Sequence, residues 1–324
     1  CALPILQVEH PVTEEITGLD LVREQLRIAE GAPLGYGQDD VVLRGHAVEV
    51  RLYAEDPAND FLPAAGPVLA WEPAASPVVR YDSGVETGSV VGVEFDPMLA
   101  KVIAHAPTRR EAALKLALAL ERTRLAGLVT NRDFLVATLR HDAFLAGDTT
   151  TDFIERHAPA PQRPVTDDDR FTAAVTVALW QQAGNRAAAA VLGTLPTGWR
   201  NSSMPPQRLE LDGDTVEYAA ARDGSFAVAL AGRTGTARVA GVDGDRITVV
   251  LDRRRFEATV TVVPAGWVVG LPGGAVSLGA RDRFPRPEGS GPAGGLVAPM
   301  PGKIIDVRAT VGDAVTAGQV LVVM

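Results

Sequence analysis

Three side chains in the first part of the sequence have residue types that suit acid–base and anion chemistry. Gln7 and Glu9 are separated by Val8, so on a short strand both side chains point to one side. Arg51 follows in an alternating segment, and its guanidinium keeps its charge at every working pH. A carboxylate can move a proton and a fixed cation can stabilise a developing negative charge, so the two together suit a reaction that passes through anions.

Each candidate also has a purely structural interpretation. Glu9 could cap a turn or pair with His10. Arg51 could pair with Glu49 on the same face of its strand, a contact that contributes little when it is exposed. Asp96 stands before a proline, and Asp-Pro is a turn-forming sequence, so its carboxylate could hold a turn rather than a ligand.

The remaining basic residues of this region give no metal or second catalytic site. Lys101 follows the Asp96 block and could face the same cleft, but a solvated lysine is the favoured interpretation. Four histidines are interpreted as structural because their spacing matches no set of metal ligands: His46, His105, His141 and His157. No metal site is predicted.

The composition predicts a folded protein that binds neither nucleic acid nor a membrane. The 324 residues are 46% hydrophobic, enough for two or three domains, and the net charge of −9 leaves no dominant basic surface. The single cysteine, Cys1, excludes an internal disulfide framework and indicates a reducing compartment, with the cytoplasm as the default. We find no apolar run of about 18 residues, so no membrane span is predicted.

Local patterns predict the elements that position the candidates. In residues 44–53, Val48, Val50 and Leu52 alternate with Glu49 and Arg51, which predicts a strand with one charged face. Helical spacing predicts helices over residues 19–29, 112–118 and 131–139, the second behind a capping box that begins at residue 108.

Two proline- and glycine-rich stretches, 158–164 and 286–295, divide the chain. Between them, Thr166 caps a helix to about residue 190, and short strands over 208–278 predict an antiparallel sheet or small barrel packed on that helix. Residues 303–308 and 319–323 read as two further strands, too few for a stable domain, so the rest of that domain is expected beyond Met324. The predicted fold class is α+β.

Several ordered blocks resemble the biotin carboxylase family. Residues 6–14, Leu-Gln-Val-Glu-His-Pro-Val-Thr-Glu, resemble its active-site strand and turn, and Thr130-Asn131 resembles a later helix start. Further matching blocks follow in the family's order, at 44–51, 54–57, 61–63 and 96–101.

The later part of the chain resembles acyl-CoA carboxylase α subunits. Residues 196–201 look like a segment of the small domain that docks the carboxyltransferase β subunit. Residues 298–303 with 311–318 resemble the first half of a biotin carrier domain. Lipoyl domains share the turn formed here by Gly312-Asp313 and Gly318, but the Pro-Met-Pro-Gly sequence at residues 299–302 favours a biotin carrier domain. The implied domains are a C-terminal part of a biotin carboxylase domain (1–157), a helix plus β-barrel docking domain (158–286) and an incomplete β-rich biotinyl/lipoyl-like domain (287–324).

The resemblance implies a ligase that carboxylates biotin with ATP and bicarbonate, for transfer to an acyl-CoA. It assigns Glu9 as the base toward bicarbonate and Arg51 as the cation that faces the biotin enolate and bicarbonate. Gln7 and the Val8 backbone would position that anion, and Asp96 would contact the biotin ring. Biotin, ATP and Mg²⁺ are the implied cofactors, and a carboxyltransferase β subunit in a hetero-oligomer is the implied partner.

Some positions depart from the family. Cys1, Leu3 and Ile5 stand where it has a metal-binding Glu, an Asn and a catalytic Arg, and no Gly-rich phosphate loop is present. The carrier lysine would follow Met324, so we expect this chain alone to be an inactive fragment without biotin. The alternative is a non-catalytic assembly module, or degraded pseudo-enzyme, that docks a β subunit. Pyruvate carboxylase and urea carboxylase are disfavoured because residues 158–290 are too few for their inserted regions.

Overall fold

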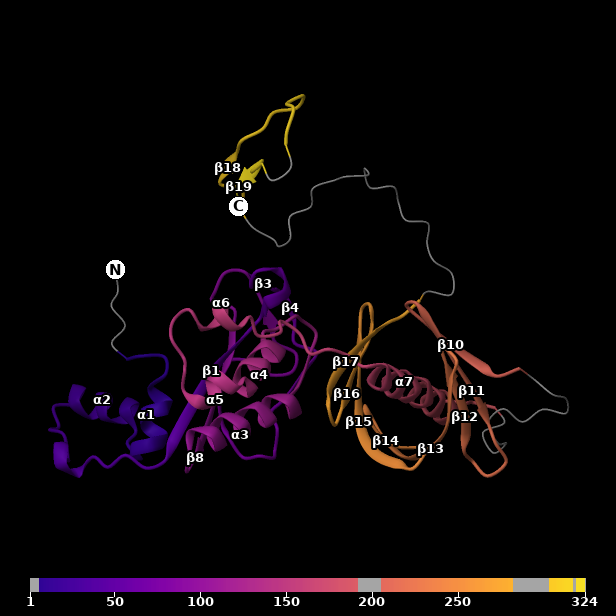
Figure 1. Ribbon diagram of the computed structural model, residues 1–324, viewed down its shortest axis with the longest axis horizontal. Helices are drawn as coiled ribbons and strands as arrows, with labels where there is room; N and C mark the ends of the chain where they lie inside the picture. The colour runs from indigo at the N-terminus through magenta and orange to yellow at the C-terminus, as the bar shows by residue number, and fades with distance from the viewer. Residues whose placement is uncertain (1–5, 192–204, 282–302, 317–318, 324) are drawn as a thin grey trace.

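The described chain forms two folded bodies and a small hairpin (Figure 1). The structure is a computed structural model that describes residues 6–191, 205–281, 303–316 and 319–323. Several stretches singled out in the sequence lie outside the described residues: positions 1, 3 and 5, residues 196–201, residues 286–295, residues 298–302, and Met324.

The first body is a mixture of helices and small sheets. Its helices are α1 (His10–Thr17), α2 (Leu21–Ala29), α3 (Arg109–Arg122), α4 (Arg132–Arg140), α5 (Asp142–Ala146) and α6 (Phe153–His157), with 3₁₀ turns at Gln38–Asp40 and Pro57–Asn59. Its strands are β1 (His46–Tyr53), β2 (Glu55–Asp56), β3 (Leu62–Pro63), β4 (Gly66–Pro67), β5 (Ala70–Glu72), β6 (Arg80–Ser83), β7 (Val90–Val91), β8 (Met98–Ala106) and β9 (Arg124–Ala126). Three of them form an antiparallel sheet in the order β1-β8-β6.

The β1-β8-β6 sheet has one apolar and one charged face. On the apolar face, Val48 and Val102 pack with Leu116 of α3 in a cluster that is almost fully buried. On the other face, Arg51 of β1 lies opposite Lys101 of β8, which lies opposite Asp82 of β6. Helix α1 packs against this charged side through β1 and β8. The predicted alternation of the β1 strand is confirmed, because its pleat sends successive side chains to opposite faces.

Helix starts follow the local sequence. The Thr108 hydroxyl accepts a hydrogen bond from the Glu111 backbone N–H, and Glu111 reaches back to complete the capping box of α3. Asp20 caps α2 by accepting from the Arg23 backbone N–H at 2.9 Å. The three helices predicted in this body are present, although α3 continues to Arg122.

The predicted strand over Gln7–Glu9 is wrong. Residues 6–9 form a bend and a turn, and Glu9 is the residue that precedes helix α1. Pro11 favours this outcome because its fixed φ suits the first helical turn, and the His10 backbone N–H already bonds to the Gln7 carbonyl. A strand also needs a neighbour, and no described strand pairs with this segment.

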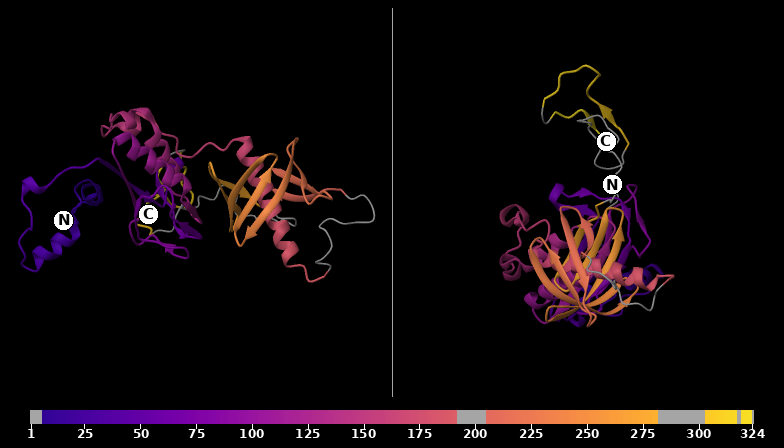
Figure 2. Two further views of the ribbon diagram at one scale, coloured as in Figure 1. Left: turned by 90° about the horizontal axis from the view of Figure 1, so that it is seen from below. Right: turned by 90° about the vertical axis from the view of Figure 1, so that its right-hand side faces the viewer.

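The second body is a curled antiparallel sheet around α7 (Asp167–Ala187), as the two views of Figure 2 show. Its strands follow one another in chain order: β10 (Gln207–Leu211), β11 (Asp214–Ala220), β12 (Phe226–Leu230), β13 (Arg233–Asp243), β14 (Arg246–Leu251), β15 (Arg254–Val263), β16 (Gly266–Leu271) and β17 (Gly274–Gly279). The backbone N–H of Asp212 donates to the Gly279 carbonyl, so the two ends of the sheet meet and the barrel closes at this point.

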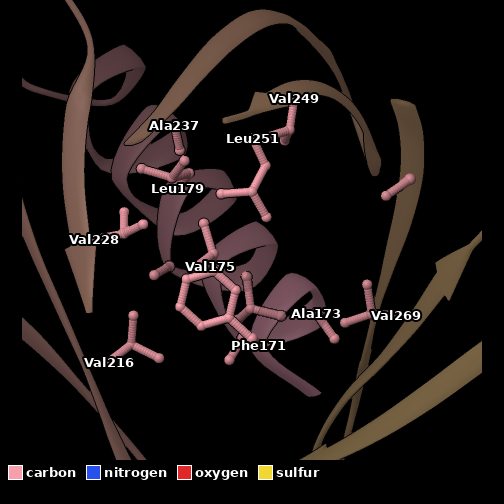
Figure 3. Close-up of a cluster of buried hydrophobic side chains, with 14 of the residues drawn as sticks. Phe171, Ala173, Val175, Leu179, Val216, Val228, Ala237, Val249, Leu251 and Val269 are labelled. Atoms are coloured by element: carbon pink, nitrogen blue, oxygen red, sulfur yellow. The ribbon is translucent and has the colours of Figure 1, made fainter. Parts of the chain in front are cut away.

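Helix α7 is the core of this barrel. Phe171, Val175 and Leu179 are fully buried against inward-facing strand residues (Figure 3). A helix enclosed on all sides carries apolar residues around much of its circumference, which explains why its middle shows no polar stripe. Its start is a capping box between Thr166 and Asp169. The α+β class is confirmed, and the order of helix and then antiparallel strands agrees with the prediction.

An ionic contact joins the two bodies. Arg124 of β9 pairs with Glu72 of β5 and with Asp245 between β13 and β14, and its Nη2 donates to Thr261 Oγ1 at 2.8 Å. Arg246 of β14 reaches back to Glu72. A cavity of about 440 Å³ lies beside this contact and is lined in part by Glu72, Arg124 and Arg246. Neither Glu9 nor Arg51 lines it. The candidate site therefore belongs to the first body alone.

The end of the described chain is a short antiparallel pair. Strands β18 (Asp306–Val307) and β19 (Val322–Val323) lie where two strands are predicted, and both are shorter than predicted. Among the described residues, no helix is both long enough and apolar enough to cross a membrane.

Candidate active site

Glu9 and Arg51 form an ion pair at the junction of α1 and β1. Glu9 Oε1 accepts from Arg51 Nη2, and Glu9 Oε2 accepts from Gln7 Nε2 at 2.9 Å. The two side chains keep 38% and 35% of their surface exposed, so the pair lies open to solvent on one side. The structure thus brings the sequence-predicted carboxylate, cation and amide together, although they come from a turn and a strand rather than from two strands.

The electrostatics of the pair hold Glu9 in its charged form. Partial burial raises the pKa of Glu9, but the hydrogen bonds from Gln7 and Arg51 outweigh it and place the pKa below its ordinary value. A hydrogen bond with Tyr53 raises the pKa of Arg51, as does its contact with Glu9. At neutral pH the site therefore presents one carboxylate and one guanidinium in contact with each other.

Lys101 belongs to the same face, so its interpretation as a solvated lysine is wrong. Its side chain is only 14% exposed. Its Nζ lies 3.3 Å from the Val8 carbonyl, 3.2 Å from His10 Nε2 and 3.3 Å from an Asp82 oxygen. Lys101 lies directly opposite Arg51 in the strand register, which is why it reaches the same face. The sequence alone could not show this, because it depends on the pairing of β1 with β8.

A second group of charges anchors α1 to the sheet. Glu14 is nearly buried and accepts from Arg80 Nη1 at 2.7 Å, while Arg80 Nε donates to Asp82 at 2.8 Å. His10 Nδ1 lies 3.0 Å from Glu14 on the same side of α1. His10 therefore pairs with Glu14 rather than with Glu9, which removes one structural alternative for Glu9. Sequence reasoning missed this group, whose only local signal is the i, i+4 spacing of His10 and Glu14.

Asn131 fixes the strand that carries Arg51. Its side chain is buried; its Oδ1 accepts from the Tyr53 backbone N–H at 2.9 Å, and its Nδ2 donates to the Arg51 carbonyl at 3.2 Å. One amide thus satisfies two backbone groups at the end of β1 and restrains the backbone next to the guanidinium. The sequence analysis noted Thr130-Asn131 only as part of a resemblance.

Asp96 has the geometry of a turn former. Its Oδ1 accepts from the Met98 backbone N–H at 2.8 Å, and the residue is exposed. Burial raises the pKa of nearby Glu55, and the negative charge of Asp96 adds to this rise. Asp96 therefore lies beyond the strand ends near Glu55, and no described contact joins it to Glu9 or Arg51. A role in contacting biotin stays a prediction.

Glu49 is an unusual carboxyl group on the charged face of β1. Both of its oxygens are buried without a hydrogen-bond partner among the described residues, and Arg51 pairs with Glu9 instead. Burial raises the pKa of Glu49 from 4.5 to about 7; Lys101 opposes the rise, and the charges of Glu9 and Asp82 add to it. Glu49 is thus a group whose charge changes near neutral pH.

The raised pKa of Glu49 predicts a pH-dependent stability. Between pH 4.5 and about 7 the folded chain holds a proton that the unfolded chain has released, so its contribution to stability falls as pH rises through this window. The variant Glu49→Gln, which never ionises, should match the wild type near pH 5 and be more stable than it at pH 8. Urea unfolding at both pH values measures the difference.

The exposed barrel residue Glu257 supplies the control. Glu257→Gln should leave the pH dependence of the wild type unchanged. If Glu49→Gln and the wild type lose stability in parallel between pH 5 and pH 8, Glu49 does not carry a proton in this window.

The described residues contain no group of three or more His, Cys, Asp or Glu side chains arranged to hold a metal ion. The charges of Glu9 and Arg51 neutralise one another, and the neutral amide of Gln7 donates a hydrogen bond to Glu9. This arrangement suits proton transfer to and from an anion.

Comparison with known proteins places this chain in a family. Residues 49–156 match the model of the biotin carboxylase C-terminal domain, and residues 4–36 match the model of the carbamoyl-phosphate synthase L chain, ATP binding domain. The propionyl-CoA carboxylase alpha chain of Ruegeria pomeroyi is 34% identical over 98% of this chain and 51% of its own length. The chain belongs to the α subunits of biotin-dependent carboxylases. The resemblance to this family that the sequence analysis noted is therefore confirmed.

Other relatives match a smaller part of the chain. Methylcrotonoyl-CoA carboxylase subunit alpha, mitochondrial, of Mus musculus is 48% identical over 47% of this chain and 21% of its own length. A structure of Rhizobium etli pyruvate carboxylase with acetyl coenzyme-A is similar with a TM-score of 0.51 and 33% identity, over 63% of this chain and 20% of that one.

The chain spans about half the length of the Ruegeria relative and about a fifth of the mouse relative. The mouse protein is named as mitochondrial, so the cytoplasm stays a prediction for this chain. The match of residues 4–36 to an ATP-binding model includes the turn that carries Glu9. ATP binding by the full-length enzyme, and its absence from this chain alone, stay predictions.

Proposed function

We propose that the chain takes part in the ATP- and bicarbonate-dependent carboxylation of biotin, as part of the α subunit of an acyl-CoA carboxylase. The observation that carries the proposal is the contact of Glu9 with Arg51, with Gln7 on the second carboxylate oxygen. The biotin carboxylase match over residues 49–156 includes Arg51, and the relatives named above support the reaction class.

The site residues suit two steps of this reaction. Bicarbonate must give up a proton to attack the γ-phosphate of ATP, and Glu9, charged at neutral pH, can accept it. The ureido nitrogen of biotin must lose its proton before it attacks CO₂, and Arg51 can stabilise the resulting negative charge. Gln7 can donate to the same anion once Glu9 releases it. ATP, Mg²⁺ and the biotinyl lysine are supplied, in this proposal, by other parts of the α subunit.

The test is carboxylation of free biotin by the complete α subunit with ATP and bicarbonate, followed by phosphate release and by incorporation of labelled bicarbonate. Loss of both signals on substitution of Glu9 or Arg51 supports the proposal. Full activity in both variants would place the chemistry elsewhere in the protein. We expect the present chain alone to show no turnover.

A second function, docking of a carboxyltransferase β subunit, is favoured by the barrel. The barrel is a closed body with its own core, and the match to the Ruegeria alpha chain continues through it. Such a body fits an assembly role without catalytic residues. We propose that the barrel and residues 196–201 bind the β subunit.

Co-purification with a tagged carboxyltransferase β subunit measures this docking. The complete chain should be retained, and Trp199→Ala should weaken retention, because large aromatic residues contribute most to such interfaces. Val262→Ala, at an exposed barrel position, is the control. Failure to bind every cognate β subunit would count against the docking role and leave the carboxylation role unaffected.

A further inference from the structure

Lys101 ties the turn that carries Glu9 to the sheet that carries Arg51. It stands on β8 directly opposite Arg51, and its ammonium reaches the backbone carbonyl of Val8, which lies between Gln7 and Glu9. The two residues are 93 positions apart in the sequence. Since residues 6–9 belong to no strand, this hydrogen bond is a long-range restraint on the turn.

The three acceptors around Lys101 fit an ammonium group. The Val8 carbonyl, His10 Nε2 and an Asp82 oxygen lie at 3.2–3.3 Å from Nζ, and an ammonium has three N–H donors on one atom. For His10 Nε2 to accept, the ring proton must sit on Nδ1, which lies 3.0 Å from the Glu14 carboxylate. In this tautomer Nδ1 lies at ion-pair distance from Glu14, although Nδ1 has no hydrogen-bond partner among the described residues.

The groups around Lys101 are mostly carboxylates, which complement an ammonium group. Asp82 contacts it from β6, Glu49 faces it from β1, and Glu14 acts through His10 from α1. Arg51 and Arg80 are the nearby cations, and each is already paired with a carboxylate. Lys101 is thus largely buried with acceptors on three sides, whereas a planar guanidinium would present its donors in a fixed fork that does not match three converging acceptors.

We propose that Lys101 is a positioning residue of the carboxylation site, which holds the Gln7–Glu9 turn in place so that Glu9 and Arg51 face the same anion. The identity of that anion as bicarbonate rests on the proposed function. The tie itself is a property of the described contacts, so the two can be tested separately.

The test compares Lys101→Met, which keeps the length of the side chain and removes its donors, with Lys101→Arg in the complete chain. The readouts are the titration of the Glu9 carboxyl carbon by ¹³C NMR and the hydrogen exchange of the His10 amide, which bonds to the Gln7 carbonyl. In Lys101→Met we expect the Glu9 titration to move up toward its ordinary value and His10 exchange to speed up on the order of tenfold, the effect of one lost charge-assisted hydrogen bond. Lys101→Arg should restore part of both.

Lys115 provides a matched control. Its Nζ also donates to a backbone carbonyl, that of His105 at 3.1 Å, and does not contact the site. Lys115→Met should leave the Glu9 titration and the His10 exchange unchanged even where it lowers the melting temperature. Unchanged readouts in Lys101→Met overturn the proposal. Where Lys101→Met does not fold, Lys101→Ala takes its place, and wild-type readouts in Lys101→Ala overturn the proposal equally.

A failure of the carboxylation proposal would look different. In that case Glu9→Gln retains activity in the α subunit, while the NMR readouts still respond to Lys101. Loss of activity in Glu9→Gln with no response to Lys101 supports the carboxylation site and rejects the tie.

Discussion

Replacement of Glu9 by glutamine is expected to reduce biotin carboxylation by the α subunit by about 10²- to 10⁴-fold, the range for loss of a positioned general base. The amide oxygen of the variant can still accept from Arg51, while its NH2 group replaces the oxygen that accepts from Gln7, so the contact with Arg51 is kept while the proton acceptor is lost. The loss should appear in kcat and in kcat/KM together, because proton transfer belongs to the transition state. Bicarbonate-dependent phosphate release with free biotin measures it.

Glu121 is the matched control for Glu9. It is also a glutamate held by an arginine, with both oxygens 2.8 Å from nitrogens of Arg140, but it lies on α3 away from the charged face of the sheet. Glu121→Gln should keep nearly full activity. A Glu9→Gln variant no slower than Glu121→Gln would show that the carboxylate of Glu9 is structural and serves only to pair with Arg51.

Replacement of Arg51 by lysine should lower kcat by about 10²- to 10³-fold despite the retained positive charge, the magnitude seen when one donor to a developing anion is removed. A lysine has a single compact ammonium group, so it cannot reproduce the planar guanidinium whose Nη2 contacts Glu9 while its Nε is buried. Arg51→Met should be slower still, since it also leaves Glu9 without its cation. Steady-state kinetics of biotin carboxylation distinguish the variants.

The control for this prediction is Arg140→Lys, in which the same substitution is made in the Glu121 pair. That variant should retain activity and lose at most a small part of its stability, because exposed pairs contribute about 0–1 kcal/mol. Equal activity of Arg51→Lys and the wild type would mean that charge alone suffices at this position, and that the guanidinium geometry has no catalytic part.

Much of the fold could be predicted because it depends on short-range rules. The capping box of Thr108 and Glu111 specifies the start of α3 within four residues, and the alternation around Arg51 specifies a strand with one charged face. The sequence could not predict the conformation of Gln7–Glu9. The same alternation suits a strand or a turn, and the lack of a partner strand among the described residues decided for the turn.

The sequence by itself determined which groups could do the chemistry: a carboxylate at Glu9, a permanent cation at Arg51 and an amide at Gln7. Only the tertiary structure decided that Lys101 joins them and that Glu49 is buried without a partner. The physical reason is that charge and residue type are local properties, whereas burial, pKa and hydrogen-bond partners arise when β1, β8 and α1 bring residues from distant positions onto one face.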